Sequence, residues 1–264
     1  MSNIFNVDDR QNVLDYILSA AKDFAKIVSL VQVGSGAKGF NDERSDLDFV
    51  IAIDSNESMA EVMDYIHKKV SEKYTLSFFS QSPERHLQVY VLDNLLEIDI
   101  GYGYYEHAAA LKPAFKVLFD KSGIVEDKMV RSRVGMDERV YGKKQEEDLK
   151  IAYDFALIHL MHAAVAIKRN NFLRTIGELD FVRKIYVDLL GDRYRLESTL
   201  YREMDKLPDY EKDAIKSTFV VDDSQEHLWA CLMNLTDLIY KELDGNNMPV
   251  SKEILFEYYR DLKK

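Results

Sequence analysis

The sequence predicts a protein of two parts, an α/β part with a mixed β-sheet flanked by helices and an all-α helical bundle after it. Up to residue 133, short apolar runs of strand length alternate with segments whose apolar residues recur at helical spacing. Beyond that point strand-like runs are nearly absent and long helical patterns follow one another, which is typical of a bundle. We therefore expect an α/β domain over residues 1–133 and a helical domain over residues 134–264.

The elements of the first part follow from these periodicities. Apolar residues at helical spacing predict helices over 8–24 and 58–74. Short apolar runs predict the strands, which cover residues 27–33, 47–53, 75–79, 87–92, 95–102 and 116–119. The Asp93-Asn94 pair is expected to form a two-residue hairpin turn, and the run at 116–119 an edge strand.

The second part has four strong helical patterns. They cover residues 146–169, 172–190, 225–243 and 252–262, each with apolar residues gathered on one face. Strands are nearly absent from this part, although residues 217–221 are ambiguous. Four apolar-faced helices of this length favour an up-and-down bundle.

Composition limits the function. The chain has 264 residues with 35 basic and 46 acidic side chains, so its net charge is 35 − 46 = −11. Neither part carries a basic stripe, which disfavours long nucleic acid as a partner and fits a small or cationic acceptor better. Cys231 is the only cysteine, which excludes a disulfide framework and a cysteine-based zinc site.

The sequence shows neither a membrane-spanning run nor a secretion signal that we can recognise. No apolar run approaches the length of a membrane span, and the first residues lack a basic-then-apolar signal pattern. We therefore expect no membrane partner and a cytoplasmic location. Monomer and homodimer both remain open.

Three acidic side chains suggest a metal site. Residues i and i+2 of a strand share a face, so Asp46 and Asp48 are expected to point the same way beside the apolar Leu47. Asp99, from a neighbouring strand, could complete an oxygen-lined cluster. Such oxygen ligands suit Mg²⁺, and two ions bridging a nucleotide would promote attack at phosphorus.

A glycine turn precedes these acids. Gly34 at a strand end would let the backbone approach a phosphate closely, and the Ser35 hydroxyl would add a donor. Lys38 and Arg44, from the same loop, could neutralise phosphate charge. The loop therefore predicts nucleotide binding.

The order of these motifs resembles a known superfamily. Val33-Gly34-Ser35, a gap of ten residues, Asp46-Leu47-Asp48 and later Ile98-Asp99-Ile100 resemble the DNA polymerase β-like nucleotidyltransferases. Within that superfamily the chain looks most similar to the antibiotic enzymes, the lincosamide and aminoglycoside nucleotidyltransferases. The loop at residues 34–39 and the turn at residues 117–123 carry this closer resemblance.

The resemblance implies an activity. Asp46, Asp48 and Asp99 would bind two Mg²⁺ ions, and Gly34 with Ser35 would hold the phosphates of ATP or another nucleoside triphosphate. A nucleoside monophosphate would pass to a hydroxyl of a small acceptor, plausibly an aminoglycoside or lincosamide, with release of pyrophosphate. Antibiotic resistance would then be one role that the resemblance implies, and whether it is the physiological role stays open.

Three further acceptor-side residues are expected near this centre. Glu97 lies two residues before Asp99 on the same strand face, so either carboxylate could be the general base. Tyr102 and Tyr104 follow on the same run and could line an acceptor pocket with their rings.

Two alternatives stay open. The acceptor could be a protein side chain or a tRNA end, as in toxin-type members of the superfamily. The fold could also serve as a non-catalytic nucleotide-binding module, although the intact Asp46, Asp48 and Asp99 argue against this. His159 and His162 lie one helical turn apart without a His-Glu-x-x-His pattern, so we interpret them as ordinary core or surface histidines.

Overall fold

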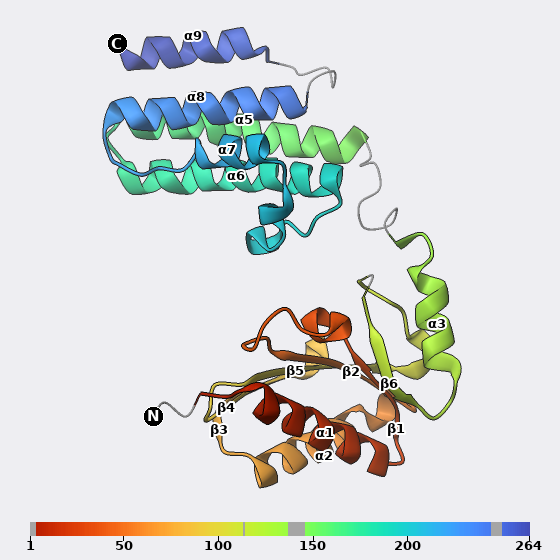
Figure 1. Cartoon of the computed structure of the whole chain (residues 1–264). Coiled ribbons are helices and arrows are strands. Elements are labelled where there is room, and N and C mark those ends of the chain that lie inside the picture. Colours follow the sequence, from red (N-terminus) through yellow and green to blue (C-terminus); the bar gives the residue numbers. More distant parts are fainter. Residues whose placement is uncertain (1–3, 113, 137–145, 244–249) are drawn as a thin grey trace. The chain divides into compact units, whose positions relative to one another are not determined.

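The chain forms two compact units. The structure, a computed structural model, describes residues 4–112, 114–136, 146–243 and 250–264. Unit 1 covers residues 1–136 and unit 2 covers residues 137–264, so the division falls three residues after the expected position 133. Unit 1 is α/β and unit 2 is helical, as the sequence predicts (Figure 1).

Unit 1 is built on a six-stranded mixed sheet with the order β3-β4-β5-β2-β1-β6. The strands are β1 (Ile27–Gln32), β2 (Leu47–Ile53), β3 (Leu76–Ser82), β4 (Leu87–Leu92), β5 (Glu97–Tyr104) and β6 (Lys116–Asp120). The central strands β2 and β5 run parallel, and the other neighbouring pairs are antiparallel. The predicted mixed sheet is confirmed, with β6 at an edge as expected.

Two helices cover one face of this sheet (Figure 1): α1 (Val7–Asp23) and α2 (Met59–Lys73). A capping box begins α1, because the Asn6 side chain accepts from the Asp9 backbone and the Asp9 side chain accepts from the Asn6 backbone. The inward residues of β2 are buried in the same apolar cluster as the inward faces of both helices; these are Leu47, Phe49, Ile51, Ile53, Val13, Leu14, Ile17, Val62, Met63 and Ile66. Asp48, between two core residues of β2, therefore faces the other side of the sheet.

The other face is partly covered by a helix that the sequence analysis did not predict. Helix α3 (Ile124–Arg133) buries only Val125 and Met129, and most of its remaining residues are polar. These two residues join Val31 and Ala52 of the sheet in a small separate cluster. With so few apolar residues the helical periodicity was too weak to detect.

The turn between β4 and β5 is longer than expected. The sequence predicts a two-residue turn at Asp93-Asn94. In the structure, β4 ends at Leu92 and β5 begins at Glu97. Leu95 adopts a left-handed conformation with φ of 69°, and its N–H donates to the Leu92 carbonyl at 3.0 Å. Asp93 and Asn94 therefore lie at the centre of the turn as predicted, and Leu95 adds a third, left-handed residue to the loop that no glycine or asparagine at this position signals.

Unit 2 is a helical bundle. Its helices are α5 (Glu146–Lys168), α6 (Phe172–Tyr194), α7 (Asp209–Lys216), α8 (Gln225–Glu242) and α9 (Lys252–Lys263). Helices α5, α6 and α8 pack on one another, and α9 packs on α5 and α8. Leu160, Leu179, Leu232 and Trp229 lie in the shared core. The four predicted bundle helices are confirmed.

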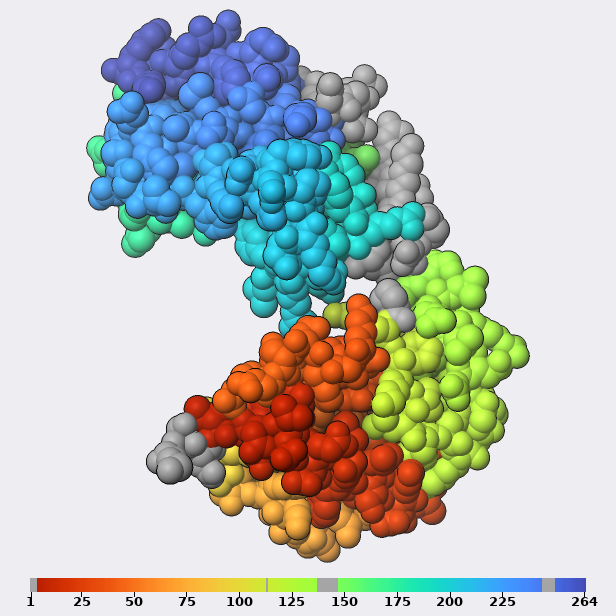
Figure 2. Space-filling model, in the orientation of Figure 1, coloured from red at the N-terminus to blue at the C-terminus, as the bar shows by residue number. Residues whose placement is uncertain are grey.

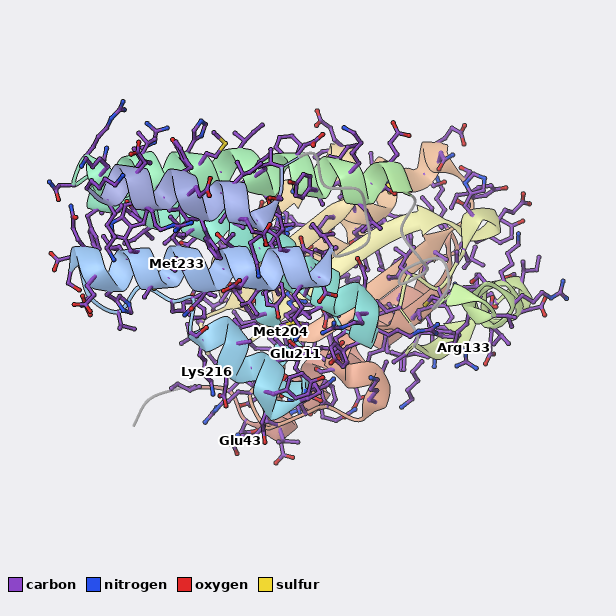
Figure 3. All side chains as sticks on the ribbon, turned by 90° about the horizontal axis from the view of Figure 1, so that it is seen from above. Glu43, Arg133, Met204, Glu211, Lys216 and Met233 are labelled. Atoms are coloured by element: carbon purple, nitrogen blue, oxygen red, sulfur yellow. The ribbon has the colours of Figure 1, made fainter. Side chains whose placement is uncertain are left out.

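A short helix and a turn complete unit 2. Helix α7 was not predicted, and its Glu211 (Figure 3) is buried, where it accepts from the Tyr186 hydroxyl at 3.0 Å. The ambiguous residues 217–221 form no strand. Instead the buried Arg183 donates to the Thr218 hydroxyl at 2.8 Å and to the Thr218 carbonyl at 2.6 Å, which fixes a turn here.

Helix α5 changes one expectation about membranes. The helix segment Glu147–Lys168 is long and apolar enough to cross a membrane, by length and composition alone. The expectation that no apolar run approaches the length of a membrane span was therefore wrong. One side of this helix, including Tyr153, Ala156 and Leu160, lies in the core of the bundle. A core helix of a folded domain passes the same test, so this finding is weak evidence for a membrane partner.

Candidate active site

The parallel pairing of β2 and β5 brings two of the predicted acids together. Asp48 and Asp99 are register partners in this pair. Neighbouring strands lie about 4.8 Å apart, and residues paired in a parallel ladder point to the same face. Asp46 stands one residue before β2 begins, and Glu97 is the first residue of β5. Four carboxylates therefore gather where β2 and β5 begin.

The glycine loop packs directly on one of these acids. Residues Gly34–Lys38 form a short 3-10 turn after β1, and the Val33 N–H donates to the Asp48 carbonyl at 3.0 Å. Gly34 has φ of +61°, and a Cβ placed on it would lie 2.0 Å from Asp48 Oδ2. Only glycine allows this approach, so the loop and the carboxylates form one site.

Three polar side-chain atoms at this site are buried without a hydrogen-bond partner among the described residues. They are Ser35 Oγ, Asp99 Oδ1 and Gln32 Nε2. Gln32 ends β1, and a Cβ placed on Gly36 would lie 2.3 Å from its Nε2, so the amide lies beneath the loop. Because buried polar atoms are normally paired, three such atoms together indicate a ligand-binding site.

Gln32 was missed in the sequence analysis. The available signal was a glutamine at the end of the mostly apolar run of β1, two residues before Gly34.

The carboxylates perturb one another. Burial, together with the charges of the neighbouring Glu97, Asp48 and Asp46, raises the pKa of Asp99 to about 6. Like charges at this density are costly without a compensating cation. The set of oxygen donors and the unpartnered Asp99 Oδ1 therefore fit Mg²⁺, and Asp46, Asp48 and Asp99 are the residues that would hold it.

Lys38 and Arg44, the two predicted phosphate-binding cations, lie in different surroundings. Lys38 closes the glycine loop with an exposed side chain. Arg44 donates to the Phe5 carbonyl and has one guanidinium nitrogen 3.7 Å from Glu43, so the structure ties it to the N-terminal segment. Its side chain is half exposed.

Arg10 of α1, which the sequence patterns did not single out, holds the segment that leads to the first carboxylate. Its Nη1 donates to the carbonyls of Asp42 and Ser45, at 3.0 Å each, and its guanidinium lies 3.7 Å from the centre of the Phe40 ring. The loop that leads to Asp46 lies at the surface beside α1 (Figure 2). A buried arginine thus anchors the segment immediately before the first carboxylate.

The expected acceptor-lining tyrosines are not beside the carboxylates. Tyr102 is buried in the core on the opposite face of β5, where its hydroxyl donates to Gln88 Oε1. It faces away from Asp99, because the two residues are three positions apart and side chains alternate along a strand. Tyr104 lies five residues beyond Asp99, about 17 Å along the strand, and its ring contacts Tyr105 and His107. The prediction for these two residues is corrected accordingly.

Comparison with known proteins gives structural likeness at low identity. No family model matches the chain, and no curated protein matches it in sequence. An aminoglycoside 6-adenyltransferase from Bacillus subtilis is similar in structure, with TM-score 0.43, 15% identity and coverage of 96% of this chain and 98% of that chain. A nucleotidyltransferase-like protein from Exiguobacterium sibiricum has TM-score 0.42, 10% identity and coverage of 96% and 80%.

A third similar structure is a cytoplasmic RNA terminal U-transferase, with TM-score 0.30, 14% identity and coverage of 68% of this chain and 47% of that chain. All three TM-scores lie below 0.5, and no identity exceeds 15%. Likeness at this level does not define a substrate.

Proposed function

We propose that the chain is a Mg²⁺-dependent nucleotidyltransferase. It would transfer a nucleoside monophosphate, AMP from ATP in the simplest case, to a hydroxyl of a small acceptor such as an aminoglycoside or a lincosamide. The observation that supports this most strongly is the pairing of Asp48 with Asp99 beneath a glycine loop whose Gly34 touches the Asp48 carboxylate. Motif spacing and strand register point to the same site.

The chain's own residues divide the work. Asp46, Asp48 and Asp99 hold the metal, which when bound neutralises the triphosphate and stabilises charge on the transferred phosphorus. The close backbone approach at Gly34 and the unpartnered Ser35 hydroxyl receive phosphate oxygens. Because Ser35 Oγ has no other partner among the described residues, it is available to donate.

The reaction forms one bond and breaks one. The acceptor hydroxyl oxygen attacks the α-phosphorus, the bond from that phosphorus to the bridging oxygen breaks, and pyrophosphate leaves. Asp99 or Glu97 accepts the hydroxyl proton, since both lie on the same face of β5 two residues apart. Most of the rate enhancement would come from positioning and charge stabilisation.

The charge of the chain supports a small cationic acceptor. The net charge of −11 raises the local concentration of cations and repels polyanions. An aminoglycoside is polycationic and carries several hydroxyls, so it meets both requirements.

A pyrophosphate-release assay tests the proposal. The four ribonucleoside triphosphates are combined with a panel of aminoglycosides and lincosamides, with and without Mg²⁺. We expect Mg²⁺-dependent release with at least one pair, and its loss in Asp48→Asn. Asp54→Asn is the matched control, because Asp54 follows the opposite end of β2 and is exposed.

Other outcomes separate the alternatives. Nucleotide binding without Mg²⁺-dependent release would favour a non-catalytic module. Release that requires a protein or tRNA acceptor would replace the antibiotic as substrate. Turnover that survives Asp48→Asn would rule out the metal assignment.

A further inference from the structure

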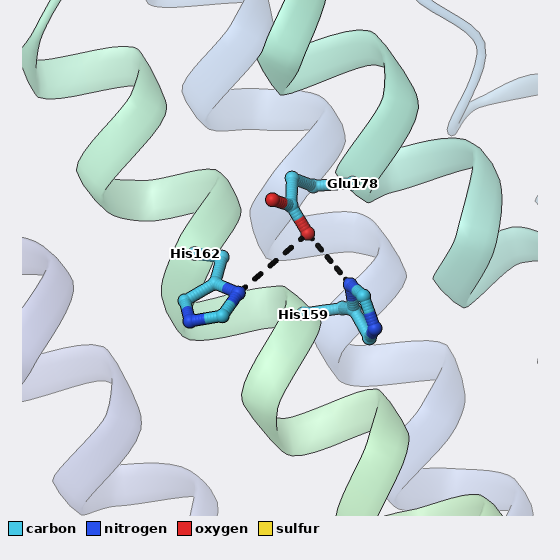
Figure 4. A group of neighbouring side chains, drawn as sticks. All are labelled: His159, His162 and Glu178. Atoms are coloured by element: carbon cyan, nitrogen blue, oxygen red, sulfur yellow. Dashed lines mark hydrogen bonds and ion pairs between the residues drawn. The ribbon is translucent and has the colours of Figure 1, made fainter.

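Unit 2 brings together three side chains of types that commonly bind metals, far in sequence from the carboxylates of unit 1. His159 and His162 lie one turn apart on α5, and Glu178 faces them from the neighbouring helix α6 (Figure 4). One ligand atom from each of the three lies within 4.8 Å of the others. The sequence pattern alone did not reveal this group, because the third residue, Glu178, comes from another helix.

Hydrogen bonding accounts for the contact of Glu178 with His159 but not for its contact with His162. His159 Nδ1 lies 2.6 Å from Glu178 Oε2, which is within hydrogen-bonding distance. His162 Nδ1 points at the same oxygen from 3.8 Å, too far for a hydrogen bond (Figure 4). Glu178 Oε2 thus lies between the Nδ1 atoms of both histidines and forms a hydrogen bond only with that of His159.

A small dication would accommodate all three ligand atoms. In a tetrahedral zinc site with bonds near 2.0 Å, ligand atoms lie about 3.3 Å apart. The two observed separations, 2.6 and 3.8 Å, bracket that value. Changes of less than 1 Å, within reach of side-chain rotation, would therefore bring both histidines and Glu178 to bonding distance.

The surroundings orient the ligands. Arg174 donates to the other oxygen of Glu178 at 3.1 Å, which leaves Oε2 directed at the histidines. The Phe181 ring stacks on His159 at 3.9 Å and limits its rotation. The Arg174 charge opposes a cation, but its side chain is half exposed and solvent screens it.

We propose that His159, His162 and Glu178 bind a Zn²⁺-like transition-metal ion that clamps α5 to α6. Two imidazoles and one carboxylate suit such ions and not Mg²⁺, which prefers oxygen ligands. Three protein ligands leave at least one position for water or another small ligand. This site is independent of the proposed nucleotidyl transfer.

Zinc titration of the full chain tests the proposal. The protein is stripped with a chelator and kept in excess Mg²⁺, so that the carboxylates of unit 1 are occupied. Zn²⁺ binding is measured by calorimetry and by the shift of the unfolding temperature. We expect one tight Zn²⁺ per chain and a higher unfolding temperature with zinc than without it.

Two variants and one control locate the ion. His162→Ala removes a half-exposed ligand, and Glu178→Gln keeps the shape of the carboxylate. Each should weaken zinc binding about tenfold or more and abolish the rise in unfolding temperature. His107→Ala, which removes an exposed histidine of unit 1, should leave both unchanged.

A second probe guards against variants that fold poorly. Co²⁺ bound by nitrogen and oxygen ligands in a low-coordinate site absorbs visible light, and this band should be present in the wild type and absent in His162→Ala. Absence of tight zinc binding in the wild type, or equal binding in His162→Ala and Glu178→Gln, would overturn the proposal. The group would then be an ion pair only.

Discussion

The Cα of Gly34 lies against the carboxylate of Asp48, so closely that an added Cβ would stand 2.0 Å from Asp48 Oδ2. This contact couples the loop proposed to hold phosphates to an acid proposed to hold the metal. It also means that a change in one must displace the other.

Gly34→Ala should abolish activity while leaving a folded protein. The new methyl group would displace the Asp48 carboxylate, and misplacement by about 1 Å can cost on the order of 100-fold in rate. Pyrophosphate release and the unfolding temperature measure the two effects. Gly123→Ala is the matched control, because Gly123 has a similar φ of +69° but nothing within 4 Å of its added Cβ. If both variants lose activity equally, the clash with Asp48 is not the cause.

Asp99→Asn should stabilise the metal-free protein at neutral pH. The pKa of Asp99 is raised to about 6 in the folded state, above its unfolded value near 3.8, by burial and by neighbouring carboxylates. Its ionised form is therefore disfavoured by folding. The resulting loss of folding stability is fully present above pH 6. It disappears below about pH 4, where Asp99 is protonated in both the folded and the unfolded state.

Urea unfolding of the wild type and Asp99→Asn at pH 8 and pH 4, in a chelator, measures this difference. We expect the variant to gain on the order of 1 kcal/mol at pH 8, after allowance for partial exposure, and little at pH 4. Added Mg²⁺ should stabilise the wild type more than the variant. A variant that is less stable at pH 8 without metal would contradict the assignment of Asp99 to a crowded acidic site.

Arg10→Ala should lower both stability and turnover. The buried guanidinium donates to the carbonyls of Asp42 and Ser45, and each charged hydrogen bond contributes roughly 1.5–3 kcal/mol. Loss of these bonds frees the segment before Asp46, so we expect a fall in kcat and in the apparent affinity for Mg²⁺. Kinetics at varied Mg²⁺ measure this. Arg131→Ala, which removes an exposed arginine of α3, should change neither quantity, and normal Mg²⁺ dependence in Arg10→Ala would exclude a positioning role.

Tyr102→Phe should reduce stability without changing the KM for the acceptor. Its hydroxyl donates to Gln88 Oε1 in the core, and a buried hydrogen bond of this kind contributes about 1 kcal/mol. Denaturant unfolding and steady-state kinetics separate the two quantities. A raised acceptor KM at unchanged stability would restore Tyr102 to the acceptor site, where the sequence had placed it.

The linear sequence was enough for β2, the four long bundle helices and the acidic motif. Strong periodicities predicted β2 over residues 47–53 and the four bundle helices, since these depend on spacing within one segment. Helices α3 and α7 were not predicted, because they bury too few apolar residues to produce a clear helical periodicity. The face shared by Asp46 and Asp48 was likewise a local matter, because strand alternation needs no partner.

What the tertiary structure alone decided is which distant segments meet. The register of β5 on β2 places Asp99 beside Asp48 and turns Tyr102 into the core, and a shift of one residue would have reversed both. Arg10 reaches the loop before Asp46, and Glu178 reaches His159, only after helices pack. Periodicity reports which face of an element is buried, whereas packing of the whole chain selects the neighbour that face will touch.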